Sequence, residues 1–413
     1  MHPLLSLVRG ALRARAGRFR ETAHVAVIWL DERTGIIELL FKGLYEAVPK
    51  RGAWAYTLGS ATLVLILNQL ITGICLTMIY VPSTTEGWAS LQYIKQHDPF
   101  AQIVRGMHLW GAYVLLFVIG VHMVRTFVSG SYKRPRELNW VSGVVLLLLV
   151  LGMAITGAFL PWDQAGYWTA VVTTNIPSYT PIIGAAIRAI WRGGDMVGPL
   201  TLVRTYGLHV WVIPALLFGL IGVHLYLLRK HGEFGSYVNY RGAYRERREG
   251  LEGAPVPRGA PALSERELEP PYPALPTDDV WAAPRETEDF YPHQTFKDGI
   301  VSFVLLAIVF GLAIFYGAPL EEIGDPATVT YTPVPEWFYL PLDQLLVLLP
   351  VQLISGVLWI PLLGVVLLLA LPFFDREPER NPFERPAIVV PALLLAILLI
   401  VLTALGSGRL FNL

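Results

Sequence analysis

The chain has 413 residues, of which 54% are hydrophobic and only 15% are charged. A soluble protein of this length would form two or three domains with a more polar surface, so the composition indicates a chain solvated mainly by lipid. Its 32 basic and 32 acidic residues cancel, which excludes a general attraction to nucleic acid.

Residues 1–52 are predicted to form a basic cytoplasmic N-terminus that ends along the membrane surface. The arginine-rich start is followed only by a short apolar run at 23–30, so no signal peptide is evident. At 35–47, apolar and charged residues fall on opposite sides of a helix. This pattern is typical of an amphipathic helix at the membrane interface.

Seven apolar stretches are long enough to cross the bilayer as helices, which requires about 20 residues. They are 53–80, 101–129, 139–160, 202–229, 300–318, 345–372 and 386–406. A segment rich in proline and charge, 231–296, separates the first four from the last three and is predicted to be an extended cytoplasmic connector. The predicted fold is therefore all-α, with a four-helix bundle at 53–230 and a three-helix module at 297–413.

Charges between the stretches predict the orientation. Basic residues gather before the first stretch and after the second, fourth and sixth, whereas the segment between the fifth and sixth contains Glu321, Glu322, Asp325 and Glu336 without Lys or Arg. By the positive-inside rule, the N-terminus lies in the cytoplasm and, after seven crossings, the C-terminus lies outside.

Four histidines lie inside the apolar stretches, where ionisable side chains are costly and need a reason. His108 and His122 are fourteen positions apart in the second stretch, and His209 and His224 are fifteen apart in the fourth. In regular helices these intervals give rotations of about 40° and 60° and rises of about 21 and 22 Å. Because both stretches run in the same direction, His108 is level with His209 and His122 with His224. Each level can hold a haem iron between two imidazoles.

Glycines repeat the same interval in the first and third stretches. Gly59 and Gly73 are fourteen positions apart, as are Gly143 and Gly157. Helix glycines are commonly packing contacts. Two pairs at the histidine spacing instead predict side-chain-free patches that make room for porphyrins.

Arg105, Arg125 and Arg204 lie near the histidines at the ends of apolar runs. They can pair with haem propionates or extend to the membrane interface. A histidine bonded to a neighbouring helix remains the plain alternative for any single position. Zinc fits less well, because two imidazoles leave its shell incomplete, and the single cysteine, Cys75, excludes a four-cysteine site.

These residues, with the sequence Pro-Trp-Asp-Gln at 161–164, resemble cytochrome b of the quinol-oxidising bc complexes over nearly the whole chain. Four features resemble the split chloroplast-type form, with its two polypeptides fused. They are the fifteen-residue interval between His209 and His224, the run at 166–168, the motif at 381–386 and the end after seven helices. The run at 291–293 looks more like the mitochondrial and proteobacterial form.

The sequence Pro335, Glu336, Trp337, Phe338 resembles the Pro-Glu-Trp-Tyr signature of this family. The resemblance implies an outer quinol site with Glu336 as proton acceptor, although an exposed loop carboxylate is the alternative. Phe338 lacks the family's tyrosine hydroxyl, which Tyr339 can replace only if the backbone allows it.

On the inner side, family position suggests quinone binding and proton delivery by Arg229, Lys297 and Asp298. Extension of these side chains to the membrane interface is the alternative. Thr57 stands where the chloroplast-type form has a haem-attaching cysteine, so no covalent haem is predicted.

The resemblance implies the dihaem cytochrome b subunit of a proton-translocating respiratory quinol:cytochrome c oxidoreductase in a bacterial cytoplasmic membrane. Two non-covalent b-type haems would carry electrons from quinol at the outer face to quinone at the inner face. The implied partners are a Rieske iron-sulfur protein, a c-type cytochrome subunit and a second copy in a homodimer. The alternatives are a dihaem, quinone-linked membrane anchor of a dehydrogenase and a transporter that relays protons through its histidines.

Overall fold

The computed structural model describes residues 29, 33, 47–49, 53–180, 182–231, 287–350, 356–377 and 379–408. The chain divides into two compact units, Met1–Ala53 with Pro284–Lys297, and Trp54–Ala283 with Asp298–Leu413. Most of the predicted amphipathic helix and residues 232–286 of the predicted connector lie outside the described residues.

The first unit contains two short strands that the all-helical prediction did not include. Strand β1 (Ala47–Pro49) pairs antiparallel with β2 (Thr287–Asp289). The turn η5 (Phe290–Gln294) then leads into α12 (Thr295–Phe315). Residues 287–296 are therefore a strand, a turn and the start of a helix, and the prediction of extended chain was wrong for 290–296.

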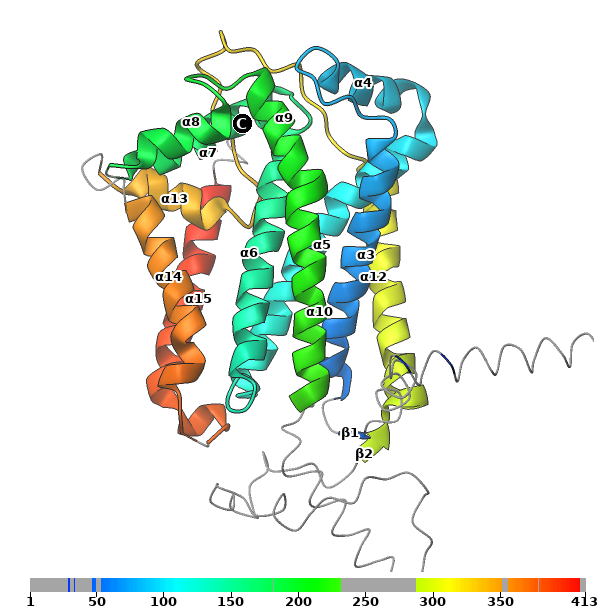
Figure 1. Ribbon diagram of the computed structural model, residues 1–413, viewed down its shortest axis with the longest axis vertical. Helices are drawn as coiled ribbons and strands as arrows, with labels where there is room; N and C mark the ends of the chain where they lie inside the picture. The colour runs from blue at the N-terminus through cyan, green and yellow to red at the C-terminus, as the bar shows by residue number, and fades with distance from the viewer. Residues whose placement is uncertain are drawn as a thin grey trace, which may run out of the picture. The chain divides into compact units, whose positions relative to one another are not determined.

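The second unit contains a bundle of four long helical segments (Figure 1). They are α3 (Thr57–Thr77), which follows η1 (Ala53–Tyr56); α5 (Pro99–Val128); α6 (Glu137–Phe159); and a continuous segment made of α9 (Pro199–Gly207), η3 (Leu208–Val212) and α10 (Ile213–His231). Residue types set some of these ends. Pro99 occupies the first turn of α5, and the Asp98 carboxylate accepts a hydrogen bond of 2.9 Å from the Ala101 N–H.

The bundle core lies between the two predicted histidine levels. Leu65 of α3, Leu115 of α5, Val150 of α6 and Leu217 of α10 are buried together, and Val309 of α12 joins them. Each of the four bundle residues falls, in sequence, between the two glycines or two histidines of its own helix. Close-packed apolar side chains thus fill the middle of the bundle.

Six helical segments among the described residues are long and apolar enough to cross a membrane, and α14 (Gly356–Phe374) adds a shorter apolar helix. The predicted stretch at 345–372 has the wrong start. Its first residues belong to a separate helix, α13 (Leu340–Leu348), which ends where Leu349 adopts an extended conformation before Pro350. A residue that precedes proline is disfavoured in the α conformation. The last span is α15 (Pro386–Ser407).

One end of the second unit, here called the upper end, contains α4 (Gly87–His97), α7 (Gln164–Asn175), η2 (Ile176–Tyr179), α8 (Gly184–Arg192) and the segment 316–339 (Figure 1). Asp163 joins two of these parts. Its carboxylate caps α7 through the Gly166 N–H at 2.9 Å and also accepts the Glu321 N–H at 3.1 Å. The motif at 161–164 therefore fixes how the segment 316–339 returns to the bundle.

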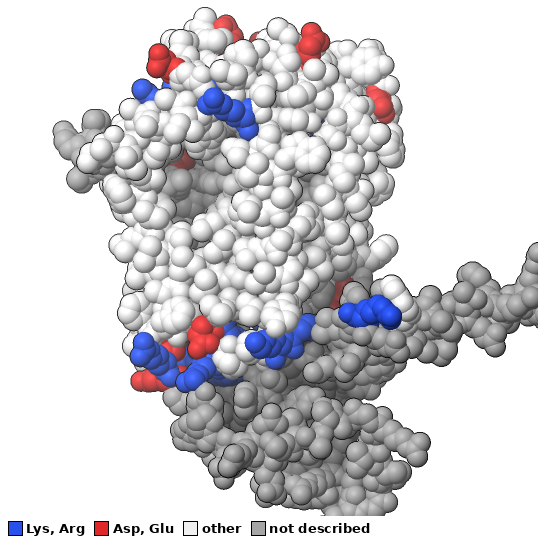
Figure 2. Space-filling view, viewed as in Figure 1, with Lys and Arg blue, Asp and Glu red and all other residues white. Residues whose placement is uncertain are grey.

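The opposite, lower end contains the loop 129–136 and residues 375–385, which include η7 (Pro382–Glu384). Figure 2 shows a band of Lys and Arg with some Asp and Glu at this end, Asp and Glu with a few Lys and Arg at the upper end, and almost no charge between the two ends on the face in view. This distribution is the one that a membrane-spanning bundle requires.

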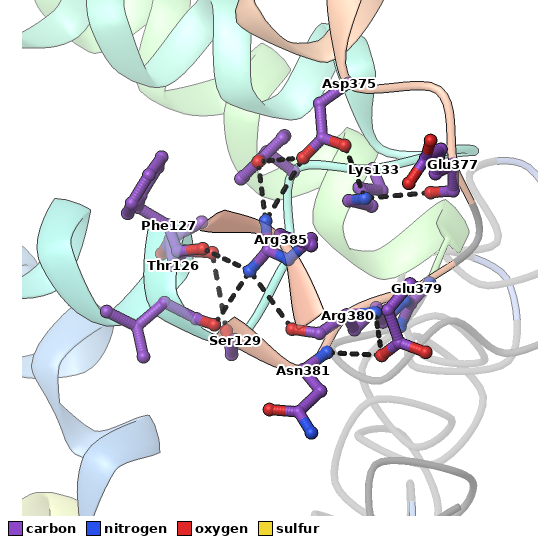
Figure 3. Close-up of polar contacts among 12 residues, drawn as sticks. Thr126, Phe127, Ser129, Lys133, Asp375, Glu377, Glu379, Arg380, Asn381 and Arg385 are labelled. Atoms are coloured by element: carbon purple, nitrogen blue, oxygen red, sulfur yellow. Dashed lines mark hydrogen bonds and ion pairs between the residues drawn. The ribbon is translucent and has the colours of Figure 1, made fainter. Parts of the chain in front are cut away.

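A buried ion cluster at the lower end joins the two predicted helical modules (Figure 3). Asp375, after α14, accepts hydrogen bonds from Lys133 at 2.6 Å, Arg385 at 3.1 Å and the Tyr132 hydroxyl. Arg385 also donates to the Val128 carbonyl at 3.1 Å, at the end of α5. We call Tyr132, Lys133, Asp375 and Arg385 the Asp375 cluster. It fastens loop 129–136 of the bundle to the α14–α15 connection.

Candidate functional site

The structure brings the four histidines of the bundle together as two couples. The ring centroids of His108 and His209 are 6.2 Å apart, and the ring planes are inclined at 75°. His122 and His224 are the second couple and lie close enough to interact electrostatically. The couples are those predicted from the parallel course of the second and fourth stretches.

The spacing of the upper couple fits one metal ion between two imidazoles. Metal–nitrogen bonds of about 2.0 Å on opposite sides of one ion would place the ring centroids about 6 Å apart. Among the described residues, no group of three or more His, Cys, Asp or Glu side chains could hold a metal ion. Two imidazoles per level suit haem, whose porphyrin supplies the other iron ligands, better than zinc.

The four glycines predicted to make room for porphyrins each face an imidazole. The pairs are Gly73 with His108, Gly157 with His209, Gly59 with His122, and Gly143 with His224. A Cβ atom placed on each glycine would lie near the Cε1 atom of its histidine. That distance is 2.8 Å at Gly157, 3.3 Å at Gly73 and Gly143, and 3.7 Å at Gly59. Because these glycines have no side chain, the imidazoles can pack directly against the backbones of α3 and α6.

Three hydroxyl groups that sequence reasoning missed contact the histidines. They are Thr72 to His108 at 2.9 Å, Thr156 to His209 at 3.0 Å, and Ser142 to His224 at 2.8 Å, in each case to the ring atom Nδ1. A sequence signal existed, because each hydroxyl residue immediately precedes one of the four glycines. The corresponding residue before Gly59 is Leu58.

A π turn accounts for the unequal histidine intervals. His209 lies in η3, where the Ile213 N–H donates to the Leu208 carbonyl five residues earlier. Such a turn holds one more residue than an α turn. The longer interval between His209 and His224 therefore has nearly the same register as the shorter one in α5, and the rotation of about 60° predicted for a regular helix was wrong. Pro214 lacks the N–H that would complete the regular ladder at this point.

The three arginines predicted near the haems make contacts at the ends of the helices. Buried Arg105 donates to the carbonyls at 318–319 at 3.0 and 2.6 Å. The guanidinium of Arg125 lies 3.9 Å from the centre of the Tyr56 ring, and Arg204 donates to a carbonyl in α8. Pairing with propionates stays a prediction.

Glu336 lies in the 335–338 segment before α13 and is half-buried. Burial raises the pKa of Glu336 to about 7. Among the described residues, its carboxylate has no hydrogen-bond partner. A carboxyl group with a pKa near neutrality can accept and release a proton at physiological pH.

Phe338, which replaces the family's tyrosine, packs against an aromatic residue of the bundle. Its ring meets Tyr113 of α5 edge to face, with the centroids 5.8 Å apart. The Tyr339 hydroxyl donates to the Leu151 carbonyl of α6 at 2.5 Å. The hydroxyl of Tyr339 is thus bonded to the bundle, and its replacement of the missing tyrosine hydroxyl stays a prediction.

Among the three predicted inner-side residues, Asp298 lies near the His122 level. It is buried, and the Ser60 hydroxyl donates to it at 2.9 Å. Ser60 follows the glycine that faces His122. Arg229 is exposed in the last turn of α10, and Lys297 precedes Asp298 in α12.

Comparison with known families identifies both parts of the chain. The family model Cytochrome b/b6/petB matches residues 45–232, and the model Cytochrome b(C-terminal)/b6/petD matches residues 324–411. Both occur in one polypeptide, as the resemblance to a fused chloroplast-type form predicted.

Similar proteins agree with this assignment. The menaquinol:cytochrome c reductase cytochrome b subunit of Bacillus subtilis (strain 168) is 38% identical over 215 residues, which cover 50% of this chain and 96% of that protein. Cytochrome b6 of Mastigocladus laminosus is 37% identical over 207 residues, with 50% and 96% covered. A solved structure titled "Hyperthermophilic respiratory Complex III" matches with a TM-score of 0.72 and 29% identity over 92% of this chain and 91% of that one. The chain therefore belongs to the cytochrome b/b6 family.

Proposed function

We propose that this protein is the dihaem cytochrome b subunit of a respiratory, bc-type quinol:cytochrome c oxidoreductase. The observation that carries the proposal is the pair of imidazole couples inside a bundle long enough to cross a membrane. Two b-type haems, when bound, would supply the one-electron redox centres. The family matches and the respiratory relatives support this choice over a dehydrogenase anchor or a transporter.

The chain's own residues would hold the haems without covalent attachment. His108 and His209 would ligate the upper iron, and His122 and His224 the lower one. The glycines of α3 and α6 admit the imidazoles, and the apolar core between the levels fixes their separation. Arg105, Arg125 and Arg204 are the candidate partners of the propionates.

Quinol oxidation is proposed at the upper end, near the 335–338 segment. Glu336 would accept a proton from the quinol, because its half-buried carboxylate has a pKa of about 7 and no competing hydrogen bond among the described residues. Pro335, Trp337 and Phe338 would shape the apolar side of this site. The Rieske protein would take one electron, and the upper haem level the other.

Quinone reduction is proposed at the lower end. Asp298 and Ser60 form a polar pair beside the His122 level and could deliver a proton there. Arg229 and Lys297 are the candidate cations for binding quinone. Proton uptake at this end and release at the other would couple electron transfer to proton translocation.

We place the upper end outside a bacterial cytoplasmic membrane, because basic side chains gather at the lower end. The proposed partners are a Rieske iron-sulfur protein, a c-type cytochrome subunit and a second copy of this chain. The names of the Bacillus subtilis relative and of the solved respiratory complex support this setting.

The experiment is a reduced-minus-oxidised spectrum of the purified full chain, with haem quantified per polypeptide. We expect two b-type haems. His209→Ala should lose the upper haem and keep the lower one, whereas His97→Ala, at an exposed histidine in α4, should keep both. Absence of b-haem bands from the unmodified chain would exclude the proposed function. Co-purification of a dehydrogenase instead of a Rieske protein would favour the membrane-anchor alternative.

A further inference from the structure

We propose that Thr72, Thr156 and Ser142 are positioning residues that fix the ring proton of three haem-ligating histidines on Nδ1, and that Leu58 leaves His122 without this control. The inference rests on the proposed haem-binding function and adds to it. It concerns hydroxyls of α3 and α6 that would act through the histidines and would not themselves ligate the metal.

The direction of the hydrogen bonds follows from counting hydrogens. Each hydroxyl has only one, and each donates it to a backbone carbonyl one turn earlier in its own helix. Thr72 donates to the Asn68 carbonyl at 2.6 Å. Thr156 donates to the Gly152 carbonyl at 2.7 Å, and Ser142 to the Asn139 carbonyl at 2.8 Å.

Each oxygen can therefore only accept from the imidazole that it contacts. Nδ1 must carry the ring proton, and Nε2 keeps the lone pair that binds a metal. The same arrangement occurs at His108, His209 and His224. In metal sites, a partner that accepts from the second nitrogen fixes the tautomer and ring orientation and makes the imidazole a stronger donor to the metal.

The adjacent glycine reinforces the orientation. Thr72 holds Nδ1 of His108, while Gly73 faces Cε1 of the same ring. A hydroxyl residue followed by glycine thus contacts two neighbouring ring atoms, Nδ1 and Cε1, which fixes the direction of the imidazole relative to α3. The pairs 142–143 and 156–157 repeat this device on α6.

His122 is the exception. Leu58 occupies the position of the hydroxyl residue, and Gly59 makes the loosest of the four glycine contacts, at 3.7 Å. Among the described residues, no side-chain hydroxyl bonds to Nδ1 of His122. Both histidines of the upper couple therefore have a hydroxyl acceptor, but only His224 has one in the lower couple.

This asymmetry predicts opposite shifts in redox titrations. Removing an acceptor weakens the imidazole as a donor and favours the reduced metal, so Thr72→Val should raise the midpoint potential of the upper haem. Adding a hydroxyl acceptor for His122 by Leu58→Thr should lower the midpoint potential of the lower haem. A hydrogen bond of ordinary strength corresponds to about a tenfold change in the reduction equilibrium, or about 59 mV for one electron.

The experiment is a potentiometric titration of the purified, haem-loaded full chain, with electron paramagnetic resonance of each oxidised haem as a second readout. Thr62→Val is the matched control, because Thr62 lies on α3 and bonds to the Leu58 carbonyl at 2.8 Å without contacting a histidine. We expect a shift only in the upper haem for Thr72→Val, only in the lower haem for Leu58→Thr, and in neither for Thr62→Val.

Unchanged potentials and resonance signals in both test variants, with haem retained, would overturn the inference. If Thr72→Val loses the upper haem, Thr72→Ser decides. A return of the haem with its original potential supports the hydrogen bond, whereas failure to return refutes it. Absence of haem from the unmodified chain would instead refute the proposed function.

Discussion

Replacing Gly157 by alanine tests how the histidines are seated. The new Cβ would lie 2.8 Å from Cε1 of His209, whereas carbon atoms pack at about 3.5–4.0 Å. The ring or helix α6 would have to move by roughly 0.7 Å, and metal–ligand distances tolerate only about 0.2 Å. Gly59→Ala is the matched control, since its Cβ would lie 3.7 Å from His122. Both changes improve helix propensity by about 1 kcal/mol, so that contribution cancels.

We expect Gly157→Ala to lose most of the upper haem and Gly59→Ala to retain both haems. The measurement is haem content per polypeptide, together with difference spectra that separate the two haems. Retention of both haems by Gly157→Ala would refute the steric argument. Equal loss in the two variants would also refute it, and would indicate that the glycines make room for the porphyrin and not for the imidazole.

Three further predictions concern the quinol site, the π turn and the lower end. Because a proton acceptor must be ionised, the rate of quinol oxidation should rise as the pH passes through about 7, the pKa of Glu336. The variant Glu336→Gln should oxidise quinol slowly and lose this pH dependence without losing haem. A pH–rate profile that is the same in this variant as in the unmodified chain would contradict the assignment. Deleting Val210 should convert the π turn to a regular helix and keep both haems. Deleting Gly219 from the regular part of α10 should instead rotate His209 relative to His224 by about 100° and cost one haem. Haem spectra that do not distinguish the two deletions would contradict the role of the turn. Asp375→Asn should lower the free energy of unfolding by about 3–5 kcal/mol, because it removes the carboxylate charge that pairs with buried Lys133 and Arg385. A thermal unfolding midpoint in detergent equal to that of the unmodified chain would show that the cluster adds nothing to stability.

The histidine couples could be predicted from the sequence because they follow from helix geometry and from the cost of burying ionisable groups. Two helices with the same direction and nearly equal histidine intervals must present matched levels. The family resemblance then identified Glu336, and the structure places it half-buried with a raised pKa.

Other features depend on tertiary contacts that hydrophobicity does not encode. The break between α13 and α14 falls inside a continuous apolar run, so the length criterion merged the two helices. The π turn was hidden because a regular helix was assumed across Pro214. The carbonyls at 318–319 that accept from Arg105 come from a loop more than two hundred residues away in the chain.

The Asp375 cluster also bears on why related proteins can exist as separate polypeptides. Cytochrome b6 of Mastigocladus laminosus aligns with only half of this chain. Here, side chains from loop 129–136 and residues 375–385 join the halves through space, without using residues 232–286. Cutting the peptide backbone within that segment would therefore leave this attachment in place, and two separately translated pieces would retain the means to find each other and assemble.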